Sequence, residues 1–188
     1  MEWEIKMKDK KNRFYNKDEA YFILNRIDGW IHNCDTKFSI LLALLGIFFG
    51  LTINIFKCFN NLHMLIICWN DYSNLVKATI IISNLFVIIY VVLIVLCTIF
   101  SFLGINAKIK NKNDNILFWG NLSKYKDIKE VNKNFSKLTE DEYLKLLNEQ
   151  ILTNSIICTK KYMNYKKALL CLFVAILFAI LSIIMINI

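Results

Sequence analysis

Two sets of side chains in this sequence could do chemistry, and the first is basic and aromatic. It suits an anionic ligand that carries a base, because lysines attract phosphate groups and aromatic rings stack on bases. Its members are Lys124, Lys126, Lys129, Phe118, Trp119, Tyr125, Lys160 and Lys161. The same lysines also suit simple attraction to anionic lipid, which is the plainer interpretation of their charge.

The second set consists of polar residues inside or beside long apolar stretches. Its members are Asn54, Asn84, Ser83, Thr52, Asp35 and Lys37. Within lipid, polar side chains usually form hydrogen bonds between helices, and they also suit the lining of a pore in an oligomer. Asp35 and Lys37 stand at the start of the first apolar stretch. They are either a charged helix start with a lysine that reaches the membrane surface, or part of a gate.

Catalytic signatures are missing from the sequence. It contains no GxSxG, Walker A, HExxH or GxGxxG pattern, and its six cysteines do not follow a zinc spacing. The apolar stretches carry no charge, which disfavours a pump or a coupled transporter. The sequence therefore predicts no enzyme, no cofactor and no metal site.

Three uncharged stretches are long enough to cross a membrane. They are 38–56, 78–107 and 168–188, with 19, 30 and 21 residues. At about 1.5 Å per helical residue, each can cross a hydrocarbon core of about 30 Å. The chain contains no proline, and the alternation that a membrane barrel needs is absent. These features predict an all-α membrane protein with three transmembrane helices.

Lysine and arginine are concentrated in two polar segments. Residues 1–37 hold eight and residues 108–167 hold thirteen, whereas residues 57–77 hold two. The positive-inside rule then places the first two segments in the cytosol and the C-terminus outside. The predicted order is a cytosolic N-terminal helical segment 1–37, a first span 38–57, an outer loop 58–77, a second span 78–104, a cytosolic helical region 105–167 and a third span 168–188.

A helix start is marked at Thr139. The sequence Thr139-Glu140-Asp141-Glu142 is a capping box, in which the threonine and the glutamate three residues later satisfy the first backbone N–H groups of a helix. No glycine or proline separates this start from the third apolar stretch. The last cytosolic helix is therefore predicted to be continuous with the third span.

Four short motifs around the three spans resemble the Pycsar effector transmembrane family. The resemblance runs from about Ala20 to Leu172. It is carried by Tyr21-Phe22, Trp30-Ile31 and Asp35-Thr36-Lys37 followed by Ser39–Gly46, by Phe118–Ser123, by Leu138–Glu142, and by Glu149-Gln150-Ile151 with Asn154-Ser155 and Lys160-Lys161-Tyr162. The order and spacing of these motifs, rather than any one of them, carry the match.

The resemblance implies a membrane effector of an anti-phage system in the bacterial inner membrane. Such a protein responds to a nucleotide or oligonucleotide second messenger from a neighbouring nucleotidyltransferase or cyclase. It is expected to form a homo-oligomer, a tetramer or similar, whose pore depolarises or disrupts the membrane in abortive infection. Because no separate nucleotide-binding domain is appended, residues 1–37 and 105–167 would bind the ligand. A non-conducting membrane scaffold that recruits partners through its cytosolic helices is the alternative.

Overall fold

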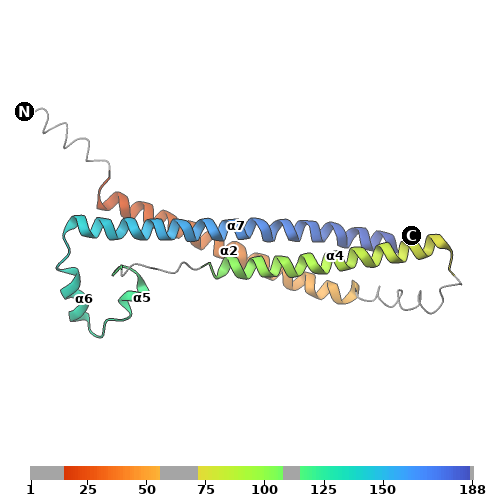
Figure 1. The fold of residues 1–188 in the computed structure, drawn as a ribbon, viewed down its shortest axis with the longest axis horizontal. Coiled ribbons are helices and arrows are strands. Elements are labelled where there is room, and N and C mark those ends of the chain that lie inside the picture. The colour runs from red at the N-terminus through yellow and green to blue at the C-terminus, as the bar shows by residue number, and fades with distance from the viewer. Residues whose placement is uncertain (1–14, 56–71, 108–114, 187–188) are drawn as a thin grey trace, which may run out of the picture. The chain divides into compact units, whose positions relative to one another are not determined.

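The computed structural model describes residues 15–55, 72–107 and 115–186. Within these ranges all regular structure is helical. The helices are α2 (Lys17–Ile55), α4 (Asn74–Ile105), α5 (Trp119–Leu122), α6 (Ile128–Phe135) and α7 (Glu140–Ile186) (Figure 1). By length and composition, α2, α4 and α7 could each cross a membrane. The predicted all-α membrane protein with three transmembrane helices is therefore confirmed.

The helix that begins after Thr139 continues into the third apolar stretch without a break, as predicted. The predicted outer loop 58–77 lies mostly outside the described residues. Its end, 74–77, belongs to α4, because the Ser73 hydroxyl caps this helix by accepting a hydrogen bond from the N–H of Val76 at 3.4 Å. The sequence predicts a helical region over 105–167 but not the separate short helices α5 and α6 within it.

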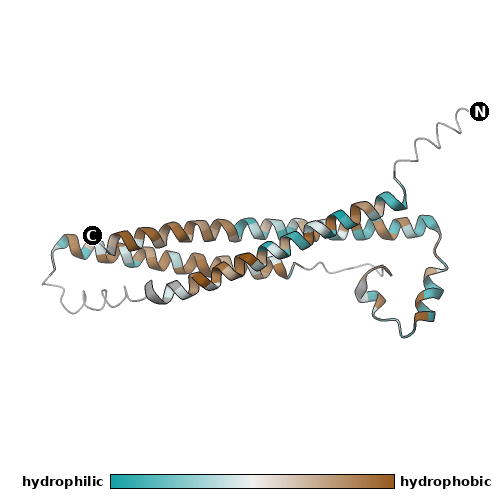
Figure 2. Ribbon diagram, turned by 180° about the vertical axis from the view of Figure 1, so that it is seen from behind, coloured by the Kyte–Doolittle hydropathy of each residue, from teal (hydrophilic) through white to brown (hydrophobic). Residues whose placement is uncertain are grey.

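The chain divides into two compact units. Unit 1 contains residues 1–34 and 107–160, and unit 2 contains residues 35–106 and 161–188. Hydrophobic residues predominate on the helical segments of unit 2, whereas those of unit 1 are largely hydrophilic (Figure 2). The helical segments of unit 2 therefore suit a lipid environment, whereas those of unit 1 suit water.

In unit 1, the capping box forms as predicted at the start of α7. The carboxylate of Glu142 accepts hydrogen bonds from the N–H and the hydroxyl of Thr139, at 2.8 and 2.9 Å. The Thr139 hydroxyl accepts one from the N–H of Glu142 at 3.3 Å. The two bonds from Thr139 lower the pKa of Glu142. Their stabilising effect is present above the ordinary pKa of glutamate and is lost as the pH falls through the lowered value.

The N-terminal parts of α2 and α7 also contact each other in unit 1 through polar groups. The hydroxyls of Tyr21 and Tyr143 are hydrogen-bonded, and Asn154 donates to the carboxylate of Asp28 at 2.7 Å. Burial, together with the Tyr21 hydroxyl, raises the pKa of Tyr143 to about 12. Tyr143 is therefore neutral and able to donate a hydrogen bond throughout the physiological pH range.

In unit 2, segments of α2, α4 and α7 pack on one another, and α4 runs antiparallel to α7. The rings of Phe86 and Phe178 lie 5.6 Å apart between centroids, and the ammonium group of Lys167 lies 5.6 Å from the centre of the Phe100 ring. The buried core consists of Phe38, Leu41, Leu45, Tyr90, Ile94, Cys97, Ala168, Leu172 and Ala175. Large apolar side chains cover the outside of these helices, as lipid requires.

Candidate functional site

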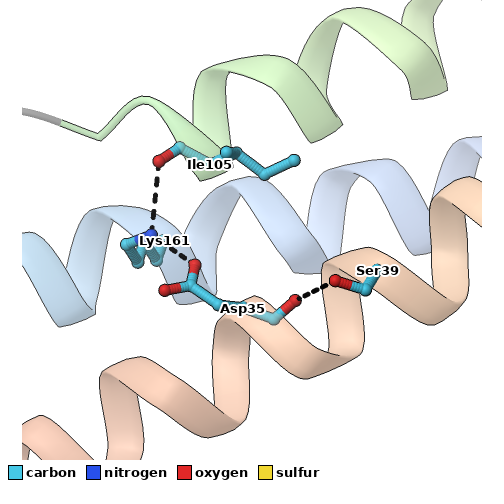
Figure 3. Close-up of polar contacts among 4 residues, drawn as sticks. All are labelled: Asp35, Ser39, Ile105 and Lys161. Atoms are coloured by element: carbon cyan, nitrogen blue, oxygen red, sulfur yellow. Dashed lines mark hydrogen bonds and ion pairs between the residues drawn. The ribbon is translucent and has the colours of Figure 1, made fainter.

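The ion pair between Asp35 and Lys161 joins three helices at the end of α4 (Figure 3). Lys161 lies on α7 and Asp35 on α2. The Lys161 ammonium group also donates a hydrogen bond, at 3.3 Å, to the carbonyl of Ile105, the last residue of α4. The last carbonyls of a helix lack helical partners and carry the negative end of the helix dipole. A single ammonium group thus neutralises a carboxylate and caps a helix.

Lys161 is the more deeply buried member of this pair. Its side chain is 8% exposed, whereas that of Asp35 is 44% exposed. Lys161 precedes buried Ala168 by seven residues, or two helical turns, so the apolar face of α7 carries the lysine into the core. A buried ammonium group is costly without a partner, which makes Asp35 necessary at this position.

Phe38 packs close to this ion pair, one helical turn further along α2. Its ring is fully buried and meets the ring of Tyr165 edge-on, with 5.6 Å between centroids. A Cβ atom built on Gly104 of α4 would lie 2.0 Å from Cζ of Phe38. Only glycine therefore lets α4 approach this ring. Lys37 has its ammonium group 5.9 Å from the centre of the Tyr165 ring, an arrangement that favours a cation at the end of the bundle.

Thr52, which was predicted to line a pore, is buried between α2 and α4. Its hydroxyl donates to the carbonyl of Phe48 at 2.7 Å and lies 3.0 Å from the hydroxyl of Tyr90. The Tyr90 hydroxyl donates to the same carbonyl at 3.1 Å. The side chain of Asn54, from the same prediction, lies outside the described residues.

Ser83 and Asn84, also predicted to line a pore, are buried on α4. The Ser83 hydroxyl lies 3.3 Å from that of Ser182 on α7. The amide nitrogen of Asn84 donates to the carbonyl of Ile80 at 2.8 Å, while its oxygen has no hydrogen-bond partner. Thr52 and Ser83 therefore lie at contacts between helices of a single chain, whereas the hydrogen bond of Asn84 stays within α4.

The basic and aromatic set is divided between the two units. Lys161 belongs to unit 2, where it pairs with Asp35, and Lys160 is exposed in unit 1. Lys124, Lys126 and Lys129 are exposed around α5 and α6 in unit 1, with Phe118 and Tyr125 half-buried among them. The side chain of Trp119 lies outside the described residues. The members of this set that lie within one continuous segment of unit 1 are those from Phe118 to Lys129.

Asn115 fixes the start of this segment, and the sequence analysis missed it. It is buried and donates a hydrogen bond to the carbonyl of Leu146 on α7 at 2.9 Å. Its side-chain oxygen accepts from the N–H of Leu117 at 2.9 Å, and its carbonyl accepts from the amide of Asn121 at 2.9 Å. An asparagine in a polar stretch is ordinary in turns, so nothing in the sequence distinguished it. Lys124 in turn donates to the side chain of Asn121 at 2.8 Å.

No cluster of three or more metal-ligating side chains occurs among residues 15–55, 72–107 and 115–186. Hydroxyl and amide groups, lysines and the Asp35–Lys161 ion pair are the polar groups described above. Such groups can bind anions, water or one another.

Comparison with known proteins identifies the family of this chain, which the geometry alone does not. A sequence model of the Pycsar effector protein domain matches residues 19–186. The chain is 27% identical over 166 residues to the Pycsar effector protein GmPycTM of Gulbenkiania mobilis, and this match covers 80% of the chain and 83% of that protein. No solved structure gives a significant match. Together with the three apolar helices, these matches confirm the predicted resemblance: the chain belongs to the Pycsar effector family, the membrane effectors of cyclic-nucleotide anti-phage systems.

Proposed function

We propose that this effector assembles as a homo-oligomer, a tetramer or similar, and makes the bacterial inner membrane permeable to ions when its cyclic-nucleotide signal changes. The observation that carries the proposal is the set of polar but uncharged side chains held inside the three apolar helices. Neutral hydroxyl and amide groups suit a gated pore, whereas a pump would need charged residues within the spans. Depolarisation would stop the growth of the infected cell before phage mature.

The effector acts, in this proposal, with residues 1–37 and 105–167 in the cytosol and its C-terminus outside. The lysine distribution supports this orientation because positively charged segments stay on the cytosolic side. The Asp35–Lys161 ion pair then lies at the cytosolic end of the spans. Protease added outside intact cells should leave 105–167 uncut, and digestion of that segment would reverse the topology.

Membrane potential provides the direct test of permeation. Cells that carry the effector and the cyclase that makes its signal should depolarise when the signal changes, and a catalytically dead cyclase is the control. The purified effector in liposomes should release entrapped ions under the same change of nucleotide. A non-conducting scaffold, the alternative function, would give no ion flux with any nucleotide.

One face of α2 suits close contact with a second copy of the chain. Ser39, Ala43, Gly46 and Gly50 follow spacings of four, three and four residues and are all exposed. A Cβ atom built on either glycine meets nothing within 4 Å. Small residues at this spacing let two helices approach closely in lipid. By contrast, α4 exposes larger side chains, which would keep a helix of a second copy farther away. They include Ile81, Leu85, Ile88 and Val92.

Replacing Gly46 and Gly50 by isoleucine is expected to reduce the oligomer to smaller species. The new side chains have room within one chain but would hold a neighbouring helix away. Crosslinking in native membranes and mass measurement in detergent or lipid discs would report the change. The matched control is Ile40→Val with Leu44→Ile. Both residues are exposed on α2 and have large side chains. An unchanged oligomer in the glycine variant would exclude this face as the contact.

The segment from Phe118 to Lys129 in unit 1 is the part of the chain that we assign to ligand response. Three exposed lysines stand there beside two half-buried aromatic rings. Changing Lys124, Lys126 and Lys129 to glutamine is expected to raise the nucleotide concentration needed for response by about tenfold or more, since bonds to a charged group contribute about 1.5–3 kcal/mol. A dye-release titration measures the shift. The control changes the exposed residues Lys133, Lys137 and Lys145 to glutamine, which removes the same amount of positive charge. An equal shift in both variants would show that overall surface charge, rather than the segment from Phe118 to Lys129, determines the response.

A further inference from the structure

The buried face of α4 carries polar groups along most of the thickness of a membrane. From Asn84 onward its buried residues follow spacings of three and four, and Ser83 stands directly before them: they are Ser83, Asn84, Val87, Tyr90, Ile94, Cys97, Ser101 and Gly104. We call this row the α4 seam. Ser83 and Ser101 are 18 positions apart along the helix, which corresponds to about 27 Å. The hydrocarbon core of a bilayer is about 30 Å thick.

From Ile81 to Ile105 the exposed face of α4 is apolar. Its exposed side chains over this range are those of isoleucine, leucine, valine and phenylalanine, among them Ile81, Ile88, Val92, Val95 and Ile99. The buried polar groups of this part of the helix lie on the α4 seam, away from the exposed face. Lipid cannot reach the α4 seam, whereas water could enter it if the helices separated.

Most of the polar groups on the α4 seam form hydrogen bonds within the chain in this structure. Tyr90 bonds to α2, Ser83 bonds to α7, and the Ser101 hydroxyl donates to the carbonyl of Cys97 at 2.8 Å. The buried residues of α7 beside the α4 seam are Ala168, Leu172, Ala175 and Ser182, three of which are small. The first three belong to the same core as Tyr90, Ile94 and Cys97, so the α4 seam is closed by packing.

The amide oxygen of Asn84 is the exception. The residue is only 5% exposed, and this oxygen has no hydrogen-bond partner. A buried acceptor without a donor raises the free energy of the closed arrangement, and water is the small donor that would satisfy it. The side-chain oxygen of Asn84 is thus a place on the α4 seam that is already suited to bind a water molecule.

Two fully apolar residues interrupt the polar groups. Val87, which is 0% exposed, stands between Ser83 and Tyr90, and Ile94, which is 2% exposed, stands between Tyr90 and Cys97. Hydrophobic side chains at a constriction keep a narrow path dry and stop ions from crossing. Their positions divide the α4 seam into short polar compartments.

We propose that water and small monovalent ions cross the membrane along the α4 seam, inside one subunit, with Val87 and Ile94 as the constrictions that hold the path closed. The inference rests on the proposed permeabilising function and locates the path within a chain rather than between chains. When α4 moves away from α2 and α7, the hydroxyls of Ser83 and Tyr90 exchange their present partners for water, whereas Ser101 keeps its bond to Cys97 within α4.

Substituting threonine for both Val87 and Ile94 tests the proposal with little change of shape at Val87 and with the loss of one methyl group at Ile94. Threonine is close to valine in size, and its hydroxyl can bond to the carbonyl four residues earlier, as Thr98 does with Ile94 on this helix at 2.9 Å. The control places threonine at Val92 and Val95, which are 52% and 46% exposed on the opposite face. Both proteins are reconstituted in liposomes that contain entrapped potassium and a pH or potential dye.

The seam variant is expected to leak ions about tenfold faster than the wild type without any nucleotide, because two buried apolar barriers become wettable. The control variant should keep the wild-type leak. An equal leak in both variants, or a wild-type leak in the seam variant while nucleotide still triggers flux, would overturn the proposal. Absence of flux from every protein with every nucleotide would instead overturn the proposed function. Circular dichroism in detergent shows that each variant remains helical before the flux is compared.

Discussion

Replacing Asp35 by alanine is expected to lower the free energy of unfolding of the three packed spans by about 3 kcal/mol. The change leaves the ammonium group of Lys161 buried without a counter-charge, and breaking a buried ion pair from one side costs about 3–5 kcal/mol. The expected value lies at the lower end because the Asp35 side chain is 44% exposed and water can reach it. Unfolding by denaturant in detergent micelles measures the loss.

Two comparisons make this result specific to the ion pair. Asp28→Ala removes a carboxylate that accepts a hydrogen bond from Asn154 at an exposed site, so it should cost about 1 kcal/mol or less. The double change of Asp35 to leucine and Lys161 to methionine should recover most of the stability, because an apolar pair of similar size often replaces a buried ion pair without loss. Equal losses for Asp35→Ala and Asp28→Ala would contradict the role given to Lys161.

Exchanging the two charges should fail to restore the structure. In Asp35→Lys with Lys161→Asp, the carboxylate at position 161 would face the carbonyl of Ile105, which accepts a bond from the ammonium group in the wild type. Two acceptors would then meet at the negative end of the α4 dipole. A fully stable charge-exchange variant would show that the contact with Ile105 contributes nothing.

Gly104→Ala is expected to be the most damaging change of a single small residue. The added Cβ would lie 2.0 Å from Cζ of Phe38, so the buried ring or α4 itself must move. Overfilling a packed core usually costs about 1–3 kcal/mol, and a rigid, fully buried ring leads us to expect about 3 kcal/mol. Thermal unfolding in detergent, followed by circular dichroism, measures this cost.

A rescue and a control accompany this substitution. Phe38→Leu removes the outer atoms of the ring and should recover part of the stability lost in Gly104→Ala. Gly29→Ala adds the same methyl group to α2 where nothing lies within 4 Å, and it should leave the unfolding temperature unchanged or slightly higher, because alanine favours a helix. An equal loss of stability at Gly29 and Gly104 would exclude the close approach of α4 to Phe38 as the cause.

The fold could be predicted because its signals are local. Uncharged stretches longer than a membrane is thick predict spans from composition alone, and the capping box at Thr139 depends on residues three positions apart. The missed helix α6 is a different case. It has only eight residues, is capped by Asp127 and contains no buried residue, so its sequence resembles that of an ordinary polar loop.

The candidate site could be predicted only in part because its contacts connect distant residues. Lys160 and Lys161 are neighbours of the same type, yet one is exposed and the other is buried. The difference depends on the phase of α7 and on Asp35, whose partner is 126 residues away. In the same way, the sequence shows that Ser83 lies in a span but not that it faces Ser182, since that choice is made by the packing of α4 against α7.

The bonding of polar side chains within a single chain has a consequence for how the cell makes this protein. Thr52 with Tyr90, and Ser83 with Ser182, satisfy one another without a second copy. A newly synthesised molecule can therefore leave the insertion machinery with these hydroxyl groups already shielded from lipid. Because this shielding does not need the proposed oligomer, we expect the host to accumulate single copies in advance at little risk.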